Sequence, residues 1–369
     1  MFRLASDDLL VAVVSPFLEV TTLKVLCVDP RTDPLWGELL CRTPSSVFHS
    51  PAWIQVLCDT YSWEPGAHVV VDDEGKPQGG LPFCRISDIF GSRIVALPFS
   101  DYCDPLVLDP QAWRPLTAAL LSEGCPVALR FLHNSLPLTE EQFAVVKQAK
   151  WHALDLQADT DVLWSQIEDS AHRAIRKSQR AGIQIRPAQS EQELRAFFEM
   201  HLKIRKNKYG LLAQPFAFFQ NIWRRFMDRQ QGFLLLALYG DTIVAGDLFL
   251  EWKETLYYKF NASLVDNLSC RPNDLLIWEA MQCGKRRGFT SLDLGLSDWD
   301  QTGLIRYKRK FGATEKTISF LRHESTNKPT SVEAEMRALL TTLTTHFTDH
   351  LVPDPITERA GEDLYRLFT

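Results

Sequence analysis

Long hydrophobic runs are missing from this sequence. The apolar stretch Leu9–Val14 is far shorter than the roughly 20 residues that cross a bilayer. It follows Asp7 and Asp8, whereas a signal peptide carries basic residues at that point. We therefore expect Leu9–Val14 to form a buried strand, and we expect a soluble, cytoplasmic protein.

Metal-binding patterns are also missing. The 8 cysteines include no Cys-x-x-Cys pair, and no histidine lies at zinc-like spacing from a cysteine pair. In a long chain without a secretion signal, we interpret these cysteines as reduced core thiols of a cytosolic protein. The sequence therefore predicts no metal site.

An excess of basic charge is lacking as well. The chain has 40 Lys and Arg against 46 Asp and Glu, which gives a formal net charge of −6. This balance argues against a protein coated in basic surface for DNA, although it allows a local basic patch. The length of 369 residues exceeds one typical core and predicts two domains.

The order of predicted elements favours a mixed α/β (α+β) fold. Residues 183–323 read as strand, two helices, three meandering strands, helix, strand, helical turn and strand, which favours a mostly antiparallel mixed sheet flanked by helices. The first 156 residues read as a looser version of this order. We expect a helix at Thr139–Ala149, one long helix over residues 159–181, and a helical tail from Ser331.

The segment from Arg271 to Gly312 holds the strongest candidates for chemistry. A helix is predicted to start at Pro272, and its free N–H groups, with Arg271 and Asn273 beside them, would suit an anion. The alternative is a well-started helix that only packs. Asp293 ends a short strand and could deprotonate an amine, or it could cap its own turn. Lys308 could stabilise an oxyanion, or it could lie on a solvated helix face.

Other candidates are less localised by pattern. Tyr258 and Lys259 lie on a strand and face opposite sides of it, so either could reach a cleft, or Lys259 could be an edge-strand lysine. Arg205, Lys208 and Tyr209 lie at the end of a predicted helix. They could bind a phosphate or carboxylate there, or the basic residues could simply interact favourably with the helix dipole. The loop Pro98–Pro105 adds Asp101 and Tyr102 as candidate binding residues. The basic stripe Arg173–Arg180 is interpreted as a solvated face.

These pieces together resemble one known family. His172–Lys177, Lys208-Tyr209-Gly210, Arg271–Leu276, Leu292-Asp293-Leu294-Gly295 and Gly303–Gly312 are similar to the FemAB-like (BioF-type, CelD-type) acyltransferases of the GNAT superfamily. The first half is similar in Phe48–Trp53 and Gly80-Leu81-Pro82-Phe83.

The resemblance implies two tandem GNAT-like domains. We place them at residues 1–156 and 157–325, with a helical tail at 326–369. It also implies Lys308 as the functional lysine, because Tyr307-Lys308-Arg309-Lys310-Phe311-Gly312 fits the family's Phe/Tyr-Lys-x-x-Phe-Gly setting. The sequence has no counterpart of the backbone loop that binds the pyrophosphate of coenzyme A in ordinary GNAT enzymes. It also has no counterpart of the coiled-coil arm found in some tRNA-dependent members.

A covalent enzyme intermediate is not expected. The sequence has no Gly-x-Ser-x-Gly elbow and no Cys/His nucleophile arrangement, which favours direct attack of an amine on a bound acyl donor. The resemblance implies an N-acyltransferase, with acyl-CoA as donor and an amine on a cell-envelope or polysaccharide precursor as acceptor. A lipid-linked acceptor would add peripheral contact with a membrane. The alternatives are an aminoacyl-tRNA-dependent peptidoglycan-bridge transferase and a catalytically silent binding module.

Overall fold

The structure, a computed structural model, describes residues 23–324 and 331–369. The predicted strand Leu9–Val14 lies outside the described residues. The first half of the chain contains β1 (Lys24–Val28), α1 (Pro34–Arg42), η1 (Val47–His49), α2 (Pro51–Tyr61), β2 (Glu64–Val71), β3 (Pro77–Asp88), β4 (Gly91–Val95), β5 (Leu106–Val107), η2 (Pro110–Ala112), α3 (Trp113–Ser122), β6 (Val127–Phe131), η3 (Leu136–Thr139) and β7 (Ala144–Asp155).

The second half repeats the same kind of order and ends in a helical tail. Its elements are α4 (Thr160–Gln166), α5 (Asp169–Arg180), β8 (Ile183–Pro187), α6 (Glu191–Tyr209), α7 (Phe216–Ile222), η4 (Trp223–Met227), β9 (Gly232–Tyr239), β10 (Thr242–Trp252), β11 (Thr255–Ser263), η5 (Val265–Cys270), α8 (Pro272–Arg286), β12 (Ser291–Asp298), α9 (Thr302–Arg309) and β13 (Thr314–His323). The tail comprises α10 (Ser331–Phe347), α11 (Asp354–Leu364) and η6 (Tyr365–Leu367).

One continuous sheet connects the two halves. Its strand order is β1-β2-β3-β4-β6-β13-β7-β12-β11-β10-β9-β8, and β5 pairs with β3. Each half contributes one parallel pair, β4 with β6 and β11 with β12, and the remaining pairs are antiparallel. The expected fold class, tandem GNAT-like units with mostly antiparallel mixed sheets, is confirmed.

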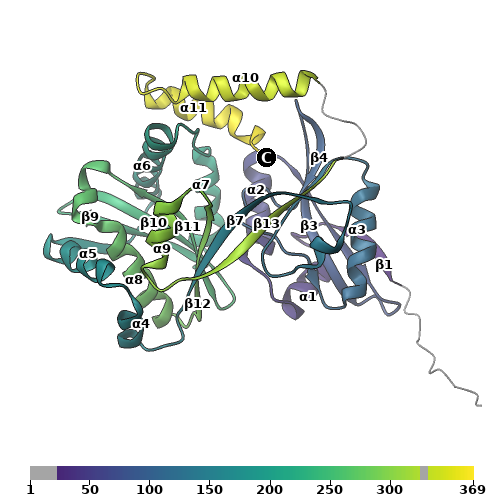
Figure 1. Ribbon diagram of the computed structural model, residues 1–369, viewed down its shortest axis with the longest axis horizontal. Helices are drawn as coiled ribbons and strands as arrows, with labels where there is room; N and C mark the ends of the chain where they lie inside the picture. Colours follow the sequence, from purple (N-terminus) through teal and green to yellow (C-terminus); the bar gives the residue numbers. More distant parts are fainter. Residues whose placement is uncertain (1–22, 325–330) are drawn as a thin grey trace, which may run out of the picture.

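The two halves exchange their last strands. β7 of the first half lies beside β12 of the second, and β13 of the second half lies beside β6 of the first. β7 and β13 pair with each other over the full crossing. Figure 1 shows both strands running between the lobes, with the first half in purple and blue and the second half in teal and green. The proposed domain boundary at residue 156 therefore comes directly after β7, a strand that pairs within the sheet of the second half.

The helices begin where the sequence supplies caps. α2 begins after Ser50, whose Oγ accepts a hydrogen bond from Trp53 N at 3.2 Å, and Pro51 occupies the first turn. α6 is capped too, because Ser190 Oγ accepts from Glu193 N at 3.4 Å. Between the halves, α2 packs against α7, and the rings of Trp53 and Phe218 lie 5.9 Å apart. Buried aromatic side chains thus join the halves as the sheet does.

Two predictions about local structure were wrong. Thr139–Ala149 is not a helix: it contains the end of η3 and the start of β7, because the chain there pairs with β13. The region 159–181 is two helices rather than one. The chain turns at Ile167, which is buried in the core, and Glu168 N donates to Lys310 O at 2.8 Å instead of continuing the helix.

Candidate active site

The candidate site lies where β11 and β12 separate. These strands pair through only three residues of each, from Thr255 with Ser291 to Tyr257 with Asp293. A bulge follows in β12, at which Gly295 adopts φ +69°. A Cβ on Gly295 would lie 2.5 Å from Asp101 Oδ2, so glycine is required both by the backbone and by the neighbouring side chain.

Asp101 reaches this separation from the first half. It belongs to the site loop, which we define as residues 96–105 between β4 and β5. Its Oδ2 accepts from Leu296 N at 3.3 Å, and its Oδ1 lies 2.6 Å from Lys259 Nζ on β11. Burial alone would raise the pKa of Asp101, but the Lys259 ammonium, the Lys308 charge and the hydrogen bond from Leu296 N together lower the pKa below its usual value. A charged pair from the two halves therefore links the two strands beside the bulge.

Asp293 is the buried carboxyl of the site, with 2% of its surface exposed. Tyr102 Oη donates to its Oδ2 at 2.9 Å, and Gly295 N donates to its Oδ1 at 2.7 Å. Burial raises the pKa of Asp293 to about 6, and the nearby Asp101 charge adds to the rise. A carboxyl with this pKa can exchange a proton near neutral pH.

Lys308 lies behind the bulge, on α9. Its ammonium donates to Gly295 O at 3.0 Å and to Leu296 O at 2.9 Å, and the residue is 3% exposed. Burial lowers the pKa of Lys308 to about 8, against the opposing effect of Asp101 and Asp293. Lys308 therefore holds the bulge in place and puts a positive charge close to Asp293.

A cavity of about 580 Å³, the central cavity, opens in front of Asp293. Both halves line it, and its polar lining includes Tyr102, Tyr257, His49, Asp104, His133, Thr255 and Ser291. Asp104 is committed to structure, since its Oδ1 accepts from three successive N–H groups, Leu132, His133 and Asn134. Of the two carboxyls in the cavity wall, Asp104 is bound by backbone N–H groups and Asp293 has a raised pKa.

A second polar group lies at the far end of β11, beside the start of α8. Asn273 donates to Ser263 Oγ and accepts from Asn261, both at 3.4 Å. Asn261 also donates to the fully buried Asp247 at 2.6 Å. Burial raises the pKa of Asp247 to about 8, despite the opposing hydrogen bond from Asn261. Asp247 is therefore uncharged near neutral pH and does not repel an anion at this position.

The structure brings together some predicted site residues and separates others. Asp293, Tyr102, Asp101, Lys259 and Lys308 form the group at the bulge. Arg271, Asn273 and Tyr258 belong to the second polar group or its surroundings: Arg271 precedes α8 with φ +61°, and Tyr258 is near enough to the Asp247 carboxyl to interact with it electrostatically. The lining of the central cavity does not include Arg205, Lys208 or Tyr209.

The residues at the end of α6 have other contacts. Arg205 Nε donates to Leu212 O at 3.1 Å, which closes the loop after the helix. Lys208 lies over the ring of Tyr209 at 4.9 Å, and Tyr209 is 47% exposed. The predicted role of Arg205, Lys208 and Tyr209 in binding a phosphate or carboxylate stays a prediction, and any such site would lie outside the central cavity.

Two residues of interest were missed in the sequence. Tyr257 lines the cavity beside Asp293, its partner on the neighbouring strand, and only the register of β11 with β12 reveals this. Asp247 did carry a signal, because an acidic residue interrupts the apolar strand Val244–Leu250. Within the part of the chain that the structure describes, no group of three or more His, Cys, Asp or Glu side chains could hold a metal ion.

The chain is similar to known proteins in its domain and in its fold. Residues 168–309 match the family model described as an acetyltransferase (GNAT) domain. The solved structure of FemX is 12% identical and has a TM-score of 0.62, covering 86% of this chain and 100% of that one. A tandem GNAT protein from the clavulanic acid biosynthesis pathway is 11% identical with a TM-score of 0.57, covering 83% and 100%. L-PGS from Bacillus licheniformis is 13% identical with a TM-score of 0.52, covering 87% and 99%. No curated protein matches the chain.

The matched domain and the tandem arrangement define the class. Residues 168–309 therefore contain a GNAT acyltransferase domain, and the expected resemblance of the chain to the FemAB-like acyltransferases is confirmed. The likeness to FemX and to the tandem GNAT protein lies in the fold of both halves. Among residues 23–324 and 331–369, no helix is both long and apolar enough to cross a membrane.

Proposed function

We propose that this protein is an N-acyltransferase that moves an acyl group from acyl-CoA to an amine on a cell-envelope or polysaccharide precursor. The observation that supports it best is the buried Asp293, whose pKa is raised to about 6, at the wall of a central cavity of about 580 Å³. An amine bound in this cavity would meet a carboxyl able to take its proton. The eight free cysteines favour a reducing compartment, the cytoplasm.

The transfer needs one proton acceptor and one source of positive charge. The amine nitrogen attacks the acyl carbonyl carbon, the new C–N bond forms, and the C–S bond to coenzyme A breaks. Asp293 takes the proton that the amine loses, and the departing thiolate takes up a proton in turn. The charge of Lys308 stabilises the negative charge that develops on the carbonyl oxygen. Tyr102 holds the Asp293 carboxylate in one orientation.

The donor would bind along the separated strands from the side of α8. Arg271 and Asn273 stand at the N-terminus of this 15-residue helix, where N–H groups and the helix dipole favour phosphate. The neutral state of Asp247 removes a nearby repulsion. Asp274, in the first turn of α8, is paired with Lys310 and so is compensated.

An aminoacyl-tRNA donor is the second candidate, and one surface favours it. Arg173, Arg176 and Arg180 of α5 line an open hollow of about 550 Å³. Within the described residues, none of the three pairs with a carboxylate. Arginines on one helix face that pair with no described carboxylate are suited to a phosphate backbone. With this donor an ester C–O bond would break instead of the thioester bond.

Ligand-dependent thermal unfolding tests the donor. The panel is acetyl-CoA, longer acyl-CoAs, free coenzyme A and an aminoacyl-tRNA, each at low and high salt. A ligand at 100 times its dissociation constant should add about 2.7 kcal/mol to the free energy of unfolding. We expect stabilisation by an acyl-CoA, followed by thiol release when amines are added.

Other binding results would contradict the proposed donor or its proposed site. Stabilisation by charged tRNA alone, lost steeply as salt rises, would replace acyl-CoA as the donor. An Arg271→Ala variant that binds acyl-CoA as tightly as the unaltered protein would remove the α8 terminus from the donor site. Asp300→Asn, an exposed change just beyond β12, is the matched control for Asp293→Asn.

A further inference from the structure

The helical tail is fastened to the second half. The guanidinium of Arg195 on α6 bonds both carboxylate oxygens of Glu358 at 2.6 Å, and Lys206 Nζ lies 3.0 Å from Asp354 Oδ1. Gly361 packs so closely that a Cβ there would lie 2.5 Å from Ala213 O. The position of α11 on α6 is therefore fixed by charge and by close backbone contact.

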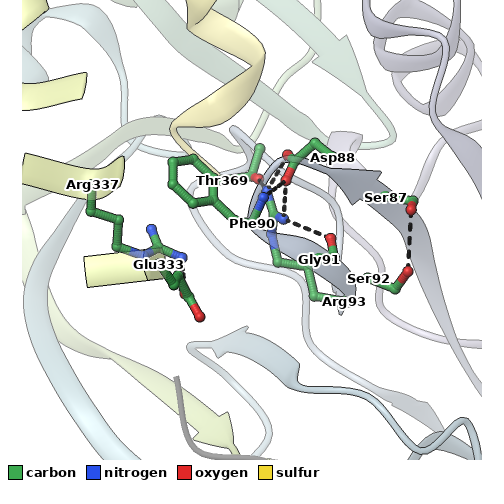
Figure 2. A network of polar contacts seen from close by, with 9 residues as sticks. All are labelled: Ser87, Asp88, Phe90, Gly91, Ser92, Arg93, Glu333, Arg337 and Thr369. Atoms are coloured by element: carbon green, nitrogen blue, oxygen red, sulfur yellow. Dashed lines mark hydrogen bonds and ion pairs between the residues drawn. The ribbon is translucent and has the colours of Figure 1, made fainter. Parts of the chain in front are cut away.

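The same tail also holds the first half. Figure 2 shows Arg93, which is paired with Asp88 at 2.8 Å and donates to Thr369 Oγ1 as well. The guanidinium of Arg337 on α10 lies 4.5 Å from the centre of the Phe90 ring. These contacts hold the turn between β3 and β4, and β4 leads directly into the site loop.

Tyr365 lies between these two attachments and contacts the site loop itself. Its ring is buried and lies 5.0 Å from the ring of Phe99. Phe99 also packs against Tyr61 at 5.2 Å and Trp63 at 5.6 Å. Phe99 adopts φ +59°, a left-handed conformation that is unfavourable for a residue with a side chain. Such a conformation persists only where surrounding contacts hold it.

The backbone of Phe99 is bonded to the charged pair of the site. Phe99 O accepts from Lys259 Nζ at 3.1 Å, and the same ammonium lies 2.6 Å from Asp101 Oδ1. Asp101 in turn accepts from Leu296 N on β12, at the bulge that Lys308 stabilises. An unbroken series of contacts therefore runs from the tail to the bulge beside Asp293.

We infer that Tyr365 is a positioning residue: through Phe99 it fixes the Lys259–Asp101 pair between β11 and β12, so the tail sets the geometry of the site. The consequence for turnover rests on the proposed function. The tail would thus act on the reaction without touching the substrate.

The first experiment needs no substrate. In the full chain, Tyr365→Leu removes the flat ring, Tyr365→Phe keeps it, and Ile356→Ala changes an exposed residue of α11 as the matched control. Phe99→Leu breaks the same contact from the other side with the tail residues intact. Hydrogen exchange of residues 96–105 and labelling of Lys259 by an amine reagent are followed by mass spectrometry.

We expect faster exchange and stronger Lys259 labelling in Tyr365→Leu and Phe99→Leu, because Lys259 is only 6% exposed at its side chain in the intact protein. Tyr365→Phe and Ile356→Ala should behave as the unaltered protein does. Unchanged exchange and labelling in whichever of the two disrupting variants folds would overturn the inference.

Turnover then separates the inference from the proposed function. Tyr365→Leu should lower kcat by about ten- to a hundredfold with little change in KM, because misplacing catalytic groups costs that much without loss of binding. Tyr365→Phe should restore the rate. If the site loop exchanges faster in Tyr365→Leu but turnover is unchanged, the tail does hold the loop. The reaction would then not take place at this site. A protein inactive with every donor would contradict the proposed function alone.

Discussion

At the scale of single residues, Asp293 and Lys308 have opposite charges and opposite pKa shifts within one small volume. The pKa of Asp293 is raised to about 6 and that of Lys308 is lowered to about 8, each chiefly by burial. Between these values both groups are charged, and outside them one is not. The proposed chemistry needs the carboxylate and the ammonium together.

The rate should therefore depend on pH with two limbs. We expect kcat to fall as pH drops through about 6, where Asp293 becomes protonated, and again as pH rises through about 8, where Lys308 loses its charge. Lys308→Met should abolish the upper limb while the lower limb remains. A profile that keeps both limbs in this variant would exclude Lys308 as the source of the upper one.

Replacing the carboxyl itself should abolish most of the activity. Asp293→Asn keeps the shape of the side chain but removes the proton acceptor, so kcat should fall by about 10²- to 10⁴-fold. Steady-state kinetics with acyl donor and amine gives the value, and Asp300→Asn should be unaffected. Full activity in Asp293→Asn would show that another group accepts the proton.

The same substitution should stabilise the fold. Native Asp293 holds its proton more tightly than the unfolded chain does, with a pKa of about 6 against about 3.9. Its stabilising contribution is thus present at low pH and is lost as pH rises through about 6. At pH 7.5, Asp293→Asn should gain on the order of 2 kcal/mol, and at pH 3.5 little. Urea unfolding at both pH values measures this, and equal effects at the two would contradict it.

At the scale of elements, the bulge in β12 sets the site. Gly295→Ala would force an ordinary residue to φ +69° and bring its Cβ onto Asp101. The backbone alone should cost about 1–2 kcal/mol, and the displaced Asp101 should lower activity as well. Gly303→Ala is the control, because nothing lies within 4 Å of its Cβ position. If Gly295→Ala were as stable and active as Gly303→Ala, the bulge would not be essential.

An element could be predicted from the sequence where its local residue pattern determines its secondary structure. The hairpins of β9, β10 and β11 were predictable, because apolar runs alternate with tight turns. β7 was mistaken in part for a helix, since its first five residues are exposed and owe their strand form to β13, far along the chain.

The candidate site shows the same limit. Asp293, Lys308, Asp101 and Lys259 were each identified singly, from motifs or from resemblance. Their meeting depends on the bulge at Gly295 and on a loop from the other half, and neither leaves a periodic signal. Tyr257 was missed for the same reason, because only strand register places it opposite Asp293.

At the scale of the whole molecule, the exchanged strands make the halves interdependent. β13 completes the sheet of the first half, and β7 completes that of the second. We expect a single cooperative unfolding transition, with circular dichroism and tryptophan fluorescence coinciding. A segment ending at residue 156 should not fold alone, because β6 and β7 would lack their shared partner. Two separated transitions, or a stable 1–156 segment, would show that the halves fold independently.

The strand exchange also has a consequence for synthesis on the ribosome. β7 ends at residue 155, whereas β13, which fits between β6 and β7, ends at residue 323. At about 5–20 residues per second, roughly ten to thirty seconds pass before the missing strand emerges. Throughout that interval β6 and β7 present unpaired backbone edges, which invite pairing with other chains. The nascent chain should therefore depend on chaperones while its first half waits for its last strand.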